Sequence, residues 1–397
     1  MAHEKELETI NIGIVGHIDH GKTTLLYKLS GKWTDTHSEE LKRGITIKLG
    51  YADIALYYDK EKGYNRDGKG EAVRHVSFVD APGHEMLMAT MLSGAAIIDA
   101  AILVVAANEG IKPQTREHLM ALQAKKIKHL IVVQNKIDLV DKENAEKNYQ
   151  EIKALLKGKY DNAQIIPVSV QQEVNIDKIY EAIAELPIPE RNIKGEPIFL
   201  IARSFDINRP GASPENLHGA VLGGTLKQGI LKVGNEIEIK PGRLVKEANQ
   251  YHYVPLKTKI VKLFNGSKEV LGLQPGGSMS VETELDMSIG KNDALAGGIA
   301  SLNGKLPALM QSLRINYNLF PEVFSSNTGI KVELLKMSEM LMLSVNTSMT
   351  LGVVKKLGKG EVELSLKVPA IAFKGDNTGI ARNIQGHWRL IGYGEVL

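Results

Sequence analysis

Residues 16–23 read Gly-His-Ile-Asp-His-Gly-Lys-Thr, and this stretch decides the expected fold. Glycine, four residues, Gly-Lys and then Ser or Thr is the spacing of a phosphate-binding loop. Residues 11–15 before it are typical of a short buried strand, and residues 24–29 after it are typical of the first turns of a helix. A strand, a glycine loop and a helix start aim backbone N–H groups and the helix dipole at one point, where an anion binds. Taken alone, the loop could be a glycine turn that binds nothing. The strand before it and the helix after it favour a site for a nucleotide phosphate.

The residues of this loop have separate expected tasks. Gly16 and Gly21 leave room for the backbone to curl around phosphate oxygens. Lys22 is expected to reach the terminal phosphates, and the hydroxyl of Thr23 to ligate the Mg²⁺ that accompanies them. The loop therefore predicts a nucleotide bound together with magnesium.

Two further segments are expected to complete the phosphate and metal site. Asp80 follows a predicted strand at 76–79 and is expected to hold Mg²⁺, directly or through water. Gly83 has no side chain, so its N–H can approach the γ-phosphate. Thr46, within Arg-Gly-Ile-Thr-Ile at 43–47, would complete the metal shell in the triphosphate state. Each segment alone is also typical of an ordinary turn, but together they occur in the order expected of a site for a nucleoside triphosphate and its magnesium ion.

A fourth segment indicates which base is bound. Asn135, Lys136 and Asp138 follow the predicted strand at 130–133 in an Asn-Lys-Ile-Asp run. The Asp138 carboxylate can accept two hydrogen bonds from N1–H and the 2-amino group of guanine, a pair that adenine lacks. Lys136 can pack its stem over the base, and backbone N–H groups near Ser169 can bind the base carbonyl. The pattern predicts GTP and GDP rather than adenine nucleotides.

Apolar periodicity places these motifs in an α/β domain. Unbroken β-branched runs alternate with helical stretches, which predicts a doubly wound, mainly parallel sheet. Pro167 indicates a strand that lies at an edge or ends there. The polar, glycine-rich insertion at 51–75 is expected to be irregular, with an exposed loop at 59–70. The remaining expected strands are 101–105, 130–133 and 165–168, and the expected helices are 114–124, 142–156 and 175–186.

The character of the chain changes at a proline-marked joint at 187–192. From Pro197 onward, short alternating strands are separated by glycine turns, which is typical of β-barrels. The sequence therefore predicts a multidomain chain. An α/β P-loop GTPase domain over 1–190 is followed by all-β barrel domains over 196–307 and 308–397.

Composition limits the classes of function. The 397 residues carry a net charge of +3, which permits a nucleic-acid partner without demanding one. The sequence contains no cysteine, which excludes disulfides and thiolate metal sites. The charged N-terminus is unlike a signal peptide, and the apolar run at 100–107 is too short to cross a bilayer. We expect a cytoplasmic protein with no membrane contact.

Taken together, the motifs resemble the translational GTPases typified by elongation factor Tu. Within that branch, residues 38–52, 84–95, 203–208 and 386–392 resemble the gamma subunit of archaeal and eukaryotic translation initiation factor two. The resemblance covers nearly the whole chain. It implies binding of methionylated initiator tRNA in the GTP state, assembly with alpha and beta subunits, and delivery to the small ribosomal subunit and mRNA complex. The compact chain favours the archaeal form.

Catalysis is expected at His84, which stands where a Ras-like enzyme has glutamine after its glycine. An imidazole can orient the attacking water and stabilise developing charge, with Asp19 and His20 as the next residues to test. The resemblance implies that Ile18 and Ile45 form an apolar gate, which makes the GTPase slow alone and stimulated by partners. The residues expected to bind the nucleotide are Gly16, His17, Ile18, Asp19, His20, Gly21, Lys22, Thr23, Thr24, Thr46, Asp80, Gly83, Asn135, Lys136, Asp138, Ser169 and Val170; the metal ligands among them are Thr23, Thr46 and Asp80.

Two departures from the family pattern carry expectations. Many members have a cysteine zinc knuckle where this chain has the cysteine-free segment 58–74, so no zinc is predicted. Val170 stands where alanine commonly follows the serine, which matters little because the backbone makes the contact.

Two alternatives remain open. One is a selenocysteine-specific or other elongation GTPase that carries aminoacyl-tRNA, and the other is a nucleotide switch with protein partners only. For the tRNA reading, the acceptor end is expected between the GTPase domain and the first barrel. Lys355, Lys356, Arg382 and Arg389 are expected to supply part of the basic surface.

Overall fold

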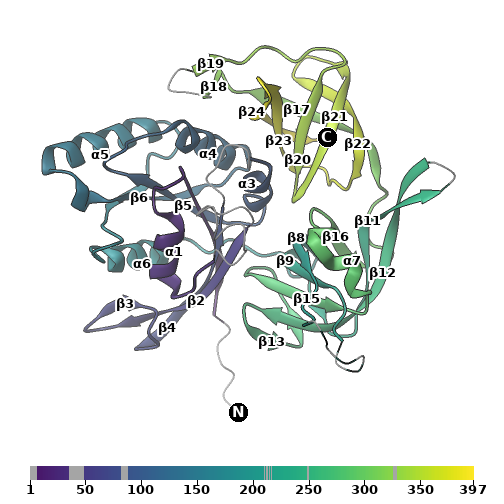
Figure 1. The fold of residues 1–397 in the computed structure, drawn as a ribbon, viewed down its shortest axis with the longest axis horizontal. Helices are drawn as coiled ribbons and strands as arrows, with labels where there is room; N and C mark the ends of the chain where they lie inside the picture. The colour runs from purple at the N-terminus through teal and green to yellow at the C-terminus, as the bar shows by residue number, and fades with distance from the viewer. Residues whose placement is uncertain are drawn as a thin grey trace. The chain divides into compact units, whose positions relative to one another are not determined.

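The computed structural model describes residues 7–34, 49–81, 88–209, 211, 213, 215, 217–247, 250–324 and 329–397. The chain forms two compact units, whose helices and strands are labelled in Figure 1. The first is Met1–Pro189 with Pro321–Lys331, and the second is Glu190–Phe320 with Val332–Leu397. Across the described ranges, every helix is too short or too polar to span a lipid bilayer.

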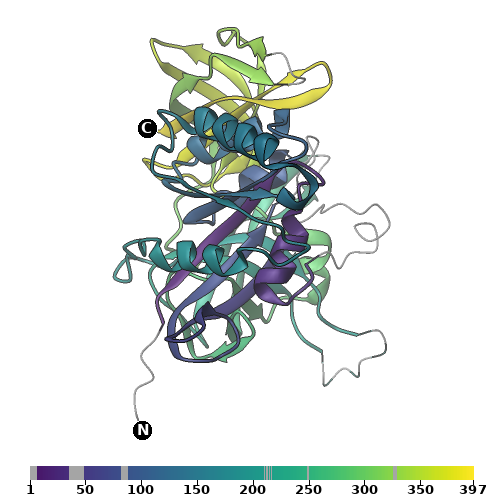
Figure 2. The same ribbon diagram turned by 90° about the vertical axis from the view of Figure 1, so that its left-hand side faces the viewer.

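A seven-stranded sheet forms the centre of the first unit. Five neighbouring strands run parallel, and β2 lies antiparallel to β4 beside them. Helices α1 and α6 cover one face, and α4 and α5 cover the other (Figures 1 and 2). This confirms the predicted doubly wound, mainly parallel sheet. In sheet order the strands are β3 (Gly63–Asn65), β2 (Gly50–Asp59), β4 (Glu71–Asp80), β1 (Thr9–Gly16), β5 (Ala100–Ala106), β6 (His129–Asn135) and β7 (Gln164–Pro167). The helices are α1 (Lys22–Ser30), α3 (Met88–Gly94), α4 (Pro113–Ala124), η2 (Ile137–Leu139), α5 (Lys142–Leu156) and α6 (Ile176–Glu185).

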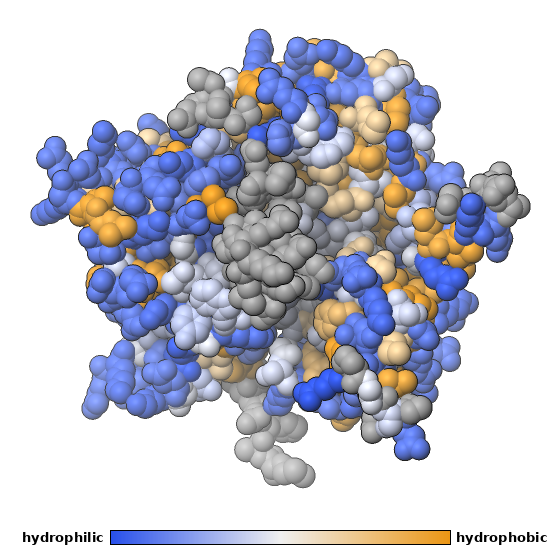
Figure 3. All heavy atoms as spheres, in the orientation of Figure 1, coloured by the Kyte–Doolittle hydropathy of each residue, from blue (hydrophilic) through white to orange (hydrophobic). Residues whose placement is uncertain are grey.

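Local sequence explains these elements. Every residue of β5 is buried, as expected of a parallel strand covered on both faces. Helix α1 ends at Gly31, whose left-handed backbone (φ 72°) lets its N–H bond the Tyr27 carbonyl at 2.7 Å. Helix α5 begins after Asp141, whose carboxylate accepts the Asn144 N–H at 2.8 Å. The outer side of α5 is mostly hydrophilic (Figure 3). Strand β7 is an edge strand that ends at Pro167, as predicted.

The expectation of an irregular insertion at 51–75 is wrong. Residues 50–59 form β2, residues 63–65 form β3, and β4 begins at Glu71. In β2 the buried residues Ala52, Ile54 and Leu56 alternate with more exposed ones, which is the period of a half-buried strand. The polar, glycine-rich segment 59–70 between the strands is typical of a loop, and it interrupts the apolar alternation on which a strand prediction depends.

A short hairpin from late in the sequence belongs to the first unit. It consists of β18 (Glu322–Phe324) and β19 (Gly329–Lys331). The Arg116 guanidinium of α4 lies 5.2 Å from the centroid of the Phe324 ring, a cation–π contact. The hairpin therefore packs on the helix that also borders the β1 loop.

The second unit contains two closed six-stranded barrels, which confirms the predicted all-β architecture. In the first barrel, the pairing of β11 with β12 closes the sheet. Its strands are, in order, β11 (Glu236–Glu247), β16 (Ile299–Leu302), β8 (Ile198–Phe205), β9 (Val221–Gln228), β15 (Met279–Thr283) and β12 (Gln250–Asn265), with β13 (Lys268–Val270) added beside β12. Smaller elements are β10 (Leu231–Lys232), β14 (Gly272–Leu273), α7 (Met287–Gly290) and η4 (Lys291–Asp293). The second barrel runs β17 (Met310–Leu319), β22 (Glu361–Ala370), β21 (Ser348–Leu357), β20 (Met340–Val345), β23 (Asn377–Ile384) and β24 (His387–Val396).

Candidate functional site

The predicted site residues that the structure describes lie at one edge of the first unit's sheet. Gly16, Asp80 and Asn135 are the last residues of β1, β4 and β6, and Ser169 lies two residues beyond the end of β7. Because carboxyl ends of parallel strands share an edge, the loops that follow them face the same region. Residues far apart in the sequence are thereby brought together.

The loop between β1 and α1 needs both of its predicted glycines. Gly16 has φ 140°, and a Cβ on it would lie 2.4 Å from the Val104 carbonyl oxygen. Gly21 has φ 92°, and a Cβ there would lie 2.5 Å from Asn135 Nδ2. Lys22 is 6% exposed, and its Nζ donates to the His17 carbonyl at 2.8 Å. The loop is a tight cradle with the lysine folded across it.

Thr23 and Asp80 meet as the metal prediction requires. Thr23 Oγ1 donates to Asp80 Oδ2 at 3.0 Å, and Thr34 Oγ1 donates to the same oxygen at 3.2 Å. Asp80 is fully buried. Hydroxyl and carboxylate oxygens are the ligands that Mg²⁺ prefers, so the residues present fit this ion.

Asn135 connects the phosphate loop at 16–23 to the segment at 169–170, which is predicted to contact the base. Its Nδ2 donates to the His20 carbonyl at 2.9 Å, and its Oδ1 accepts the Val170 N–H at 3.1 Å. Asn135 is only 4% exposed, so both bonds lie out of water. Asp138 lies nearby on η2 with its side chain exposed, while Ser169 is buried. The carboxylate is thus open to a ligand beside a fixed asparagine.

The other predicted loop residues differ in exposure. Asp19 is exposed at the tip with a left-handed backbone (φ 62°), while Ile18 and Thr24 are half-buried. His20 is fully buried, and its ring faces β5, where Nδ1 lies 3.2 Å from the Ala106 nitrogen. The side chain of His20 therefore lies behind the cradle and leaves only its peptide groups on the loop. Ile45, Thr46, Gly83 and His84 lie outside the described residues.

Sequence reasoning missed three residues at this edge: Thr34, Glu109 and His118. Glu109 Oε1 lies 3.2 Å from Lys136 Nζ, which holds the lysine beside the base loop. Glu109 follows the end of β5 by three residues, so the strand-end rule could have found it. No sequence pattern identified the roles of Thr34 and His118, because both depend on contacts across the fold.

His118 of α4 supports the loop from behind. It is 2% exposed, and its Nδ1 accepts the Gly16 N–H at 2.8 Å. Burial, followed by the nearby Lys22 charge, lowers the pKa of His118 to about 3. The imidazole is therefore neutral at physiological pH, which keeps a lone pair on Nδ1 for the glycine.

Replacement of His118 by alanine is expected to leave the Gly16 N–H buried without its acceptor. An unpaired buried donor costs about 1–3 kcal/mol. We expect this loss in the free energy of unfolding of the first unit, together with faster amide hydrogen exchange at Gly16. His129→Ala, at the partly exposed start of β6, is the control. Unchanged exchange at Gly16 would show that the His118 bond contributes nothing to the loop.

Two of the four basic residues expected to meet RNA are already engaged. Arg389 is 3% exposed, and Arg382 pairs with Glu339 while only 15% of its side chain is exposed. The expectation of a free surface charge is therefore wrong for both. Lys355 and Lys356 are exposed, and Lys356 pairs with Glu363 at 3.2 Å.

Comparisons with known proteins agree with this geometry. Residues 7–188 match the family model "Elongation factor Tu GTP binding domain", and residues 311–396 match "Initiation factor eIF2 gamma, C terminal". The translation initiation factor 2 subunit gamma of Methanococcus maripaludis (strain C7) is 50% identical over 402 residues, 98% of each chain. The protein of the same name from Pyrococcus horikoshii is 49% identical over 398 residues, 98% of this chain and 97% of its own.

Solved structures of related elongation factors have the same fold. A crystal structure of a bacterial selenocysteine-specific elongation factor matches with a TM-score of 0.78 at 25% identity, covering 98% of this chain and 58% of that one. The elongation factor SelB of Methanococcus maripaludis, in complex with the GTP analogue GppNHp, matches with a TM-score of 0.73 at 23% identity and shows the fold alone. The much higher identity to the initiation factors decides between the two groups. The chain belongs to the gamma-subunit family of translation initiation factor 2, whose members are translational GTPases with a GTP-binding domain of the elongation factor Tu type.

Proposed function

We propose that this GTPase binds methionylated initiator tRNA in its GTP state and delivers it to the small ribosomal subunit and mRNA complex. The observation that carries the proposal is identity of 50% across 98% of both chains with an initiation factor 2 gamma subunit. We further propose that the chain assembles with alpha and beta subunits, because this relative is named as the gamma subunit of a larger factor. Synthesis of proteins takes place in the cytoplasm, so we assign the chain to that compartment.

Three domains would divide this work. We place a GTP-binding domain at 1–190, a first barrel domain at 196–307 and a second at 308–397. The exposed Lys355 and Lys356 are the remaining basic candidates on the second barrel.

Within the site, the phosphates would lie on the N–H groups of the 16–23 loop, with Lys22 against the terminal oxygens. Thr23 and Asp80 would hold Mg²⁺, which neutralises phosphate charge when bound, and Thr46 would join them with the triphosphate. The support is the 3.0 Å contact between Thr23 and Asp80. The absence of cysteine from the sequence speaks against a thiolate zinc knuckle at 58–74.

The base would be read by Asp138, with Lys136 packed along it and the backbone at Ser169 and Val170 on its carbonyl. Asn135 supports this assignment because it bonds both the phosphate loop and the Val170 N–H. A carboxylate held this way accepts from guanine and repels the acceptor edge of adenine.

For hydrolysis, His84 would orient the attacking water, and Ile18 and Ile45 would keep it away until a partner acts. Phosphoryl transfer depends mainly on positioning and electrostatics, so withholding one positioned group leaves the enzyme slow alone.

Filter binding of charged and uncharged tRNAs tests the proposal. With GTP, methionylated initiator tRNA is expected to bind at least about tenfold more tightly than its uncharged form, a difference of about 1.4 kcal/mol. Binding should weaken steeply between 50 and 200 mM salt, on the order of tenfold or more, as counterions are released. Elongator aminoacyl-tRNAs serve as controls.

The other outcomes identify the alternatives. Preference for selenocysteinyl-tRNA would assign the chain to the elongation factors. Affinity that ignores both salt and the methionyl group would instead favour a switch with protein partners only.

A further inference from the structure

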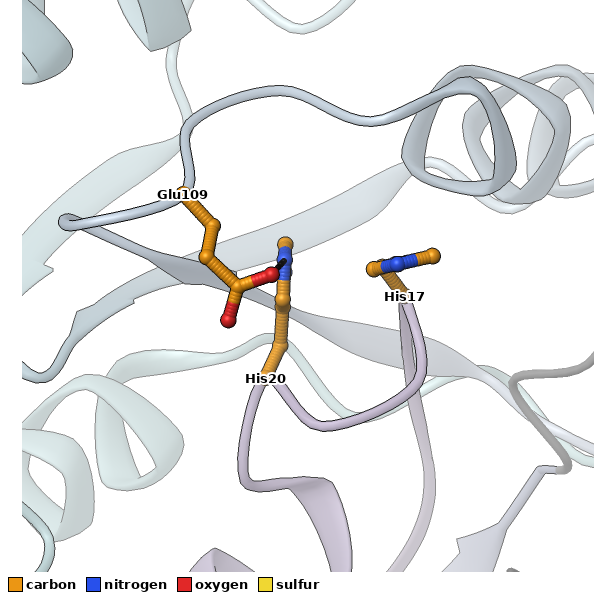
Figure 4. A group of neighbouring side chains, drawn as sticks. All are labelled: His17, His20 and Glu109. Atoms are coloured by element: carbon orange, nitrogen blue, oxygen red, sulfur yellow. Dashed lines mark ion pairs between the residues drawn. The ribbon is translucent and has the colours of Figure 1, made fainter. Parts of the chain in front are cut away.

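Three side chains of types that can bind a metal ion lie close together at the loop between β1 and α1. His17 and His20 lie on the loop between β1 and α1, and Glu109 lies on the loop after β5 (Figure 4). One ligand atom from each lies within 4.8 Å of the other two. Within the described ranges of the chain, no other three histidine or acidic side chains approach one another this closely.

Each of the two histidines has a buried ring nitrogen without a hydrogen-bond partner, although the His17 side chain also interacts with Gln114. His20 Nε2 belongs to a fully buried side chain, has no hydrogen-bond partner and lies 3.9 Å from Glu109 Oε2. His17 Nδ1 is also buried without a hydrogen-bond partner. Buried polar atoms are normally satisfied, so two such atoms beside a carboxylate are available to bind a ligand.

The protonation of the three groups suits a cation. Burial lowers the pKa of His17 and, followed by the charge of His17, lowers that of His20 to about 3. Both rings are therefore neutral at physiological pH, the form that coordinates metals. Burial acts to raise the pKa of Glu109, but the hydrogen bond from Lys136 and nearby charges outweigh it, so the carboxylate is ionised.

We propose that His17 Nδ1, His20 Nε2 and Glu109 Oε2 form a binding site for a divalent transition-metal ion such as Zn²⁺. Two imidazoles and one carboxylate form a nitrogen-rich donor set that suits Zn²⁺ or Co²⁺, whereas Mg²⁺ prefers oxygen. The site is distinct from the Thr23 and Asp80 oxygens, because the His20 ring faces β5.

Glu109 can serve the ion without releasing Lys136. Its Oε1 lies 3.2 Å from Lys136 Nζ, while Oε2 lies 3.9 Å from His20 Nε2 and also 3.9 Å from Lys112 Nζ, so the ion would have to displace the Lys112 ammonium. Neighbouring ligand atoms in a tetrahedral zinc site are about 3.3 Å apart. The three ligand atoms here, which lie within 4.8 Å of one another, must therefore move slightly closer together to bind the ion. The Glu109 side chain is 29% exposed and His17 is half-buried, so these two can move toward the fixed His20.

The tautomer of His20 allows this coordination. When Nε2 binds the ion, the single ring proton resides on Nδ1, which lies 3.3 Å from the Val104 carbonyl and donates to it. The neutral ring thus keeps its proton. The cost is the bond from the Ala106 N–H, which the present geometry directs at Nδ1. A ligand bond to the metal offsets that loss.

Cobalt titration of the full chain, nucleotide-free and without an affinity tag, tests the proposal. Co²⁺ is added in excess Mg²⁺, which occupies oxygen sites. We expect one equivalent to produce the visible absorption of a four-coordinate nitrogen–oxygen site, and one equivalent of Zn²⁺ to abolish it. His17→Gln and Glu109→Gln should each weaken Co²⁺ binding by at least about tenfold.

The chain offers a matched control in a second histidine–glutamate pair. His252 and Glu247 lie 3.6 Å apart on the exposed β11–β12 hairpin, so His252→Gln removes a surface pair of the same kind. It should leave the spectrum and affinity unchanged. Circular dichroism of each variant confirms that it is folded. The proposal is overturned by the absence of a one-to-one Co²⁺ band, by a band that survives His17→Gln and Glu109→Gln, or by one lost with His252→Gln.

Discussion

Replacement of His84 by alanine is expected to lower partner-stimulated, single-turnover GTP hydrolysis about a hundredfold or more. The affinity for GTP should stay within about threefold, or roughly 0.7 kcal/mol. The reason is that His84 is proposed to act on the attacking water and not on the bound nucleotide. It follows the buried Asp80 by four residues, and Asp80 is fixed to Thr23 across the phosphate loop.

Both quantities should be measured on one preparation, by quench-flow hydrolysis and by displacement of a fluorescent nucleotide. His129→Ala is the control, because this histidine begins β6 at the opposite end of the strand from Asn135. Unchanged stimulated turnover would remove His84 from the mechanism. Asp19 would then be the next residue to test. His20 would not, because its buried ring faces β5 and cannot reach water at the phosphates.

Asp138→Asn is expected to transfer nucleotide preference from guanine to xanthine. The substitution replaces two acceptor positions by an acceptor and a donor, so the pair to guanine N1–H and its 2-amino group is lost. Hydrogen bonds to charged groups are worth about 1.5–3 kcal/mol each, which predicts a loss of GTP affinity of about 10²- to 10⁴-fold. Xanthosine triphosphate presents a carbonyl where guanine has the amino group, so its affinity should rise.

Asp141→Asn is the matched control for this change. Asp141 lies three residues further along the same connection and caps α5, and asparagine caps helices equally well. The control should keep both its stability and its preference for GTP. Equal loss of GTP affinity in both variants would mean that the charge of the loop, and not a direct contact with the base, governs binding.

The phosphate loop was predictable because its chemistry resides in adjacent residues. Glycines that need positive φ, a lysine and a hydroxyl must follow one another there, and the strand and helix on either side carry strong apolar patterns. The same holds for the alternation of buried runs and helices, which specified the parallel sheet before any contact was known.

Residues that act through tertiary contacts left no such pattern. His118 bonds Gly16 from 102 positions away, and Thr34 reaches Asp80 from 46 positions away. Arg389 is predicted as a surface charge because the sequence alone does not reveal that this residue of β24 is buried. Strand β2 was missed for a different reason, since its alternation was present but lay beside glycine-rich turns.

Asn135 has a consequence for how the nucleotide leaves. Its two buried bonds, to the His20 carbonyl and the Val170 N–H, join the parts of the site proposed for phosphate and for base. A protein that displaced either the 16–23 loop or the loop at Val170 would therefore weaken the binding of the phosphates and of the base together. A protein that catalyses nucleotide exchange on this GTPase therefore needs to contact only one of the two loops. It can act on the loop beside the base without contacting the phosphates.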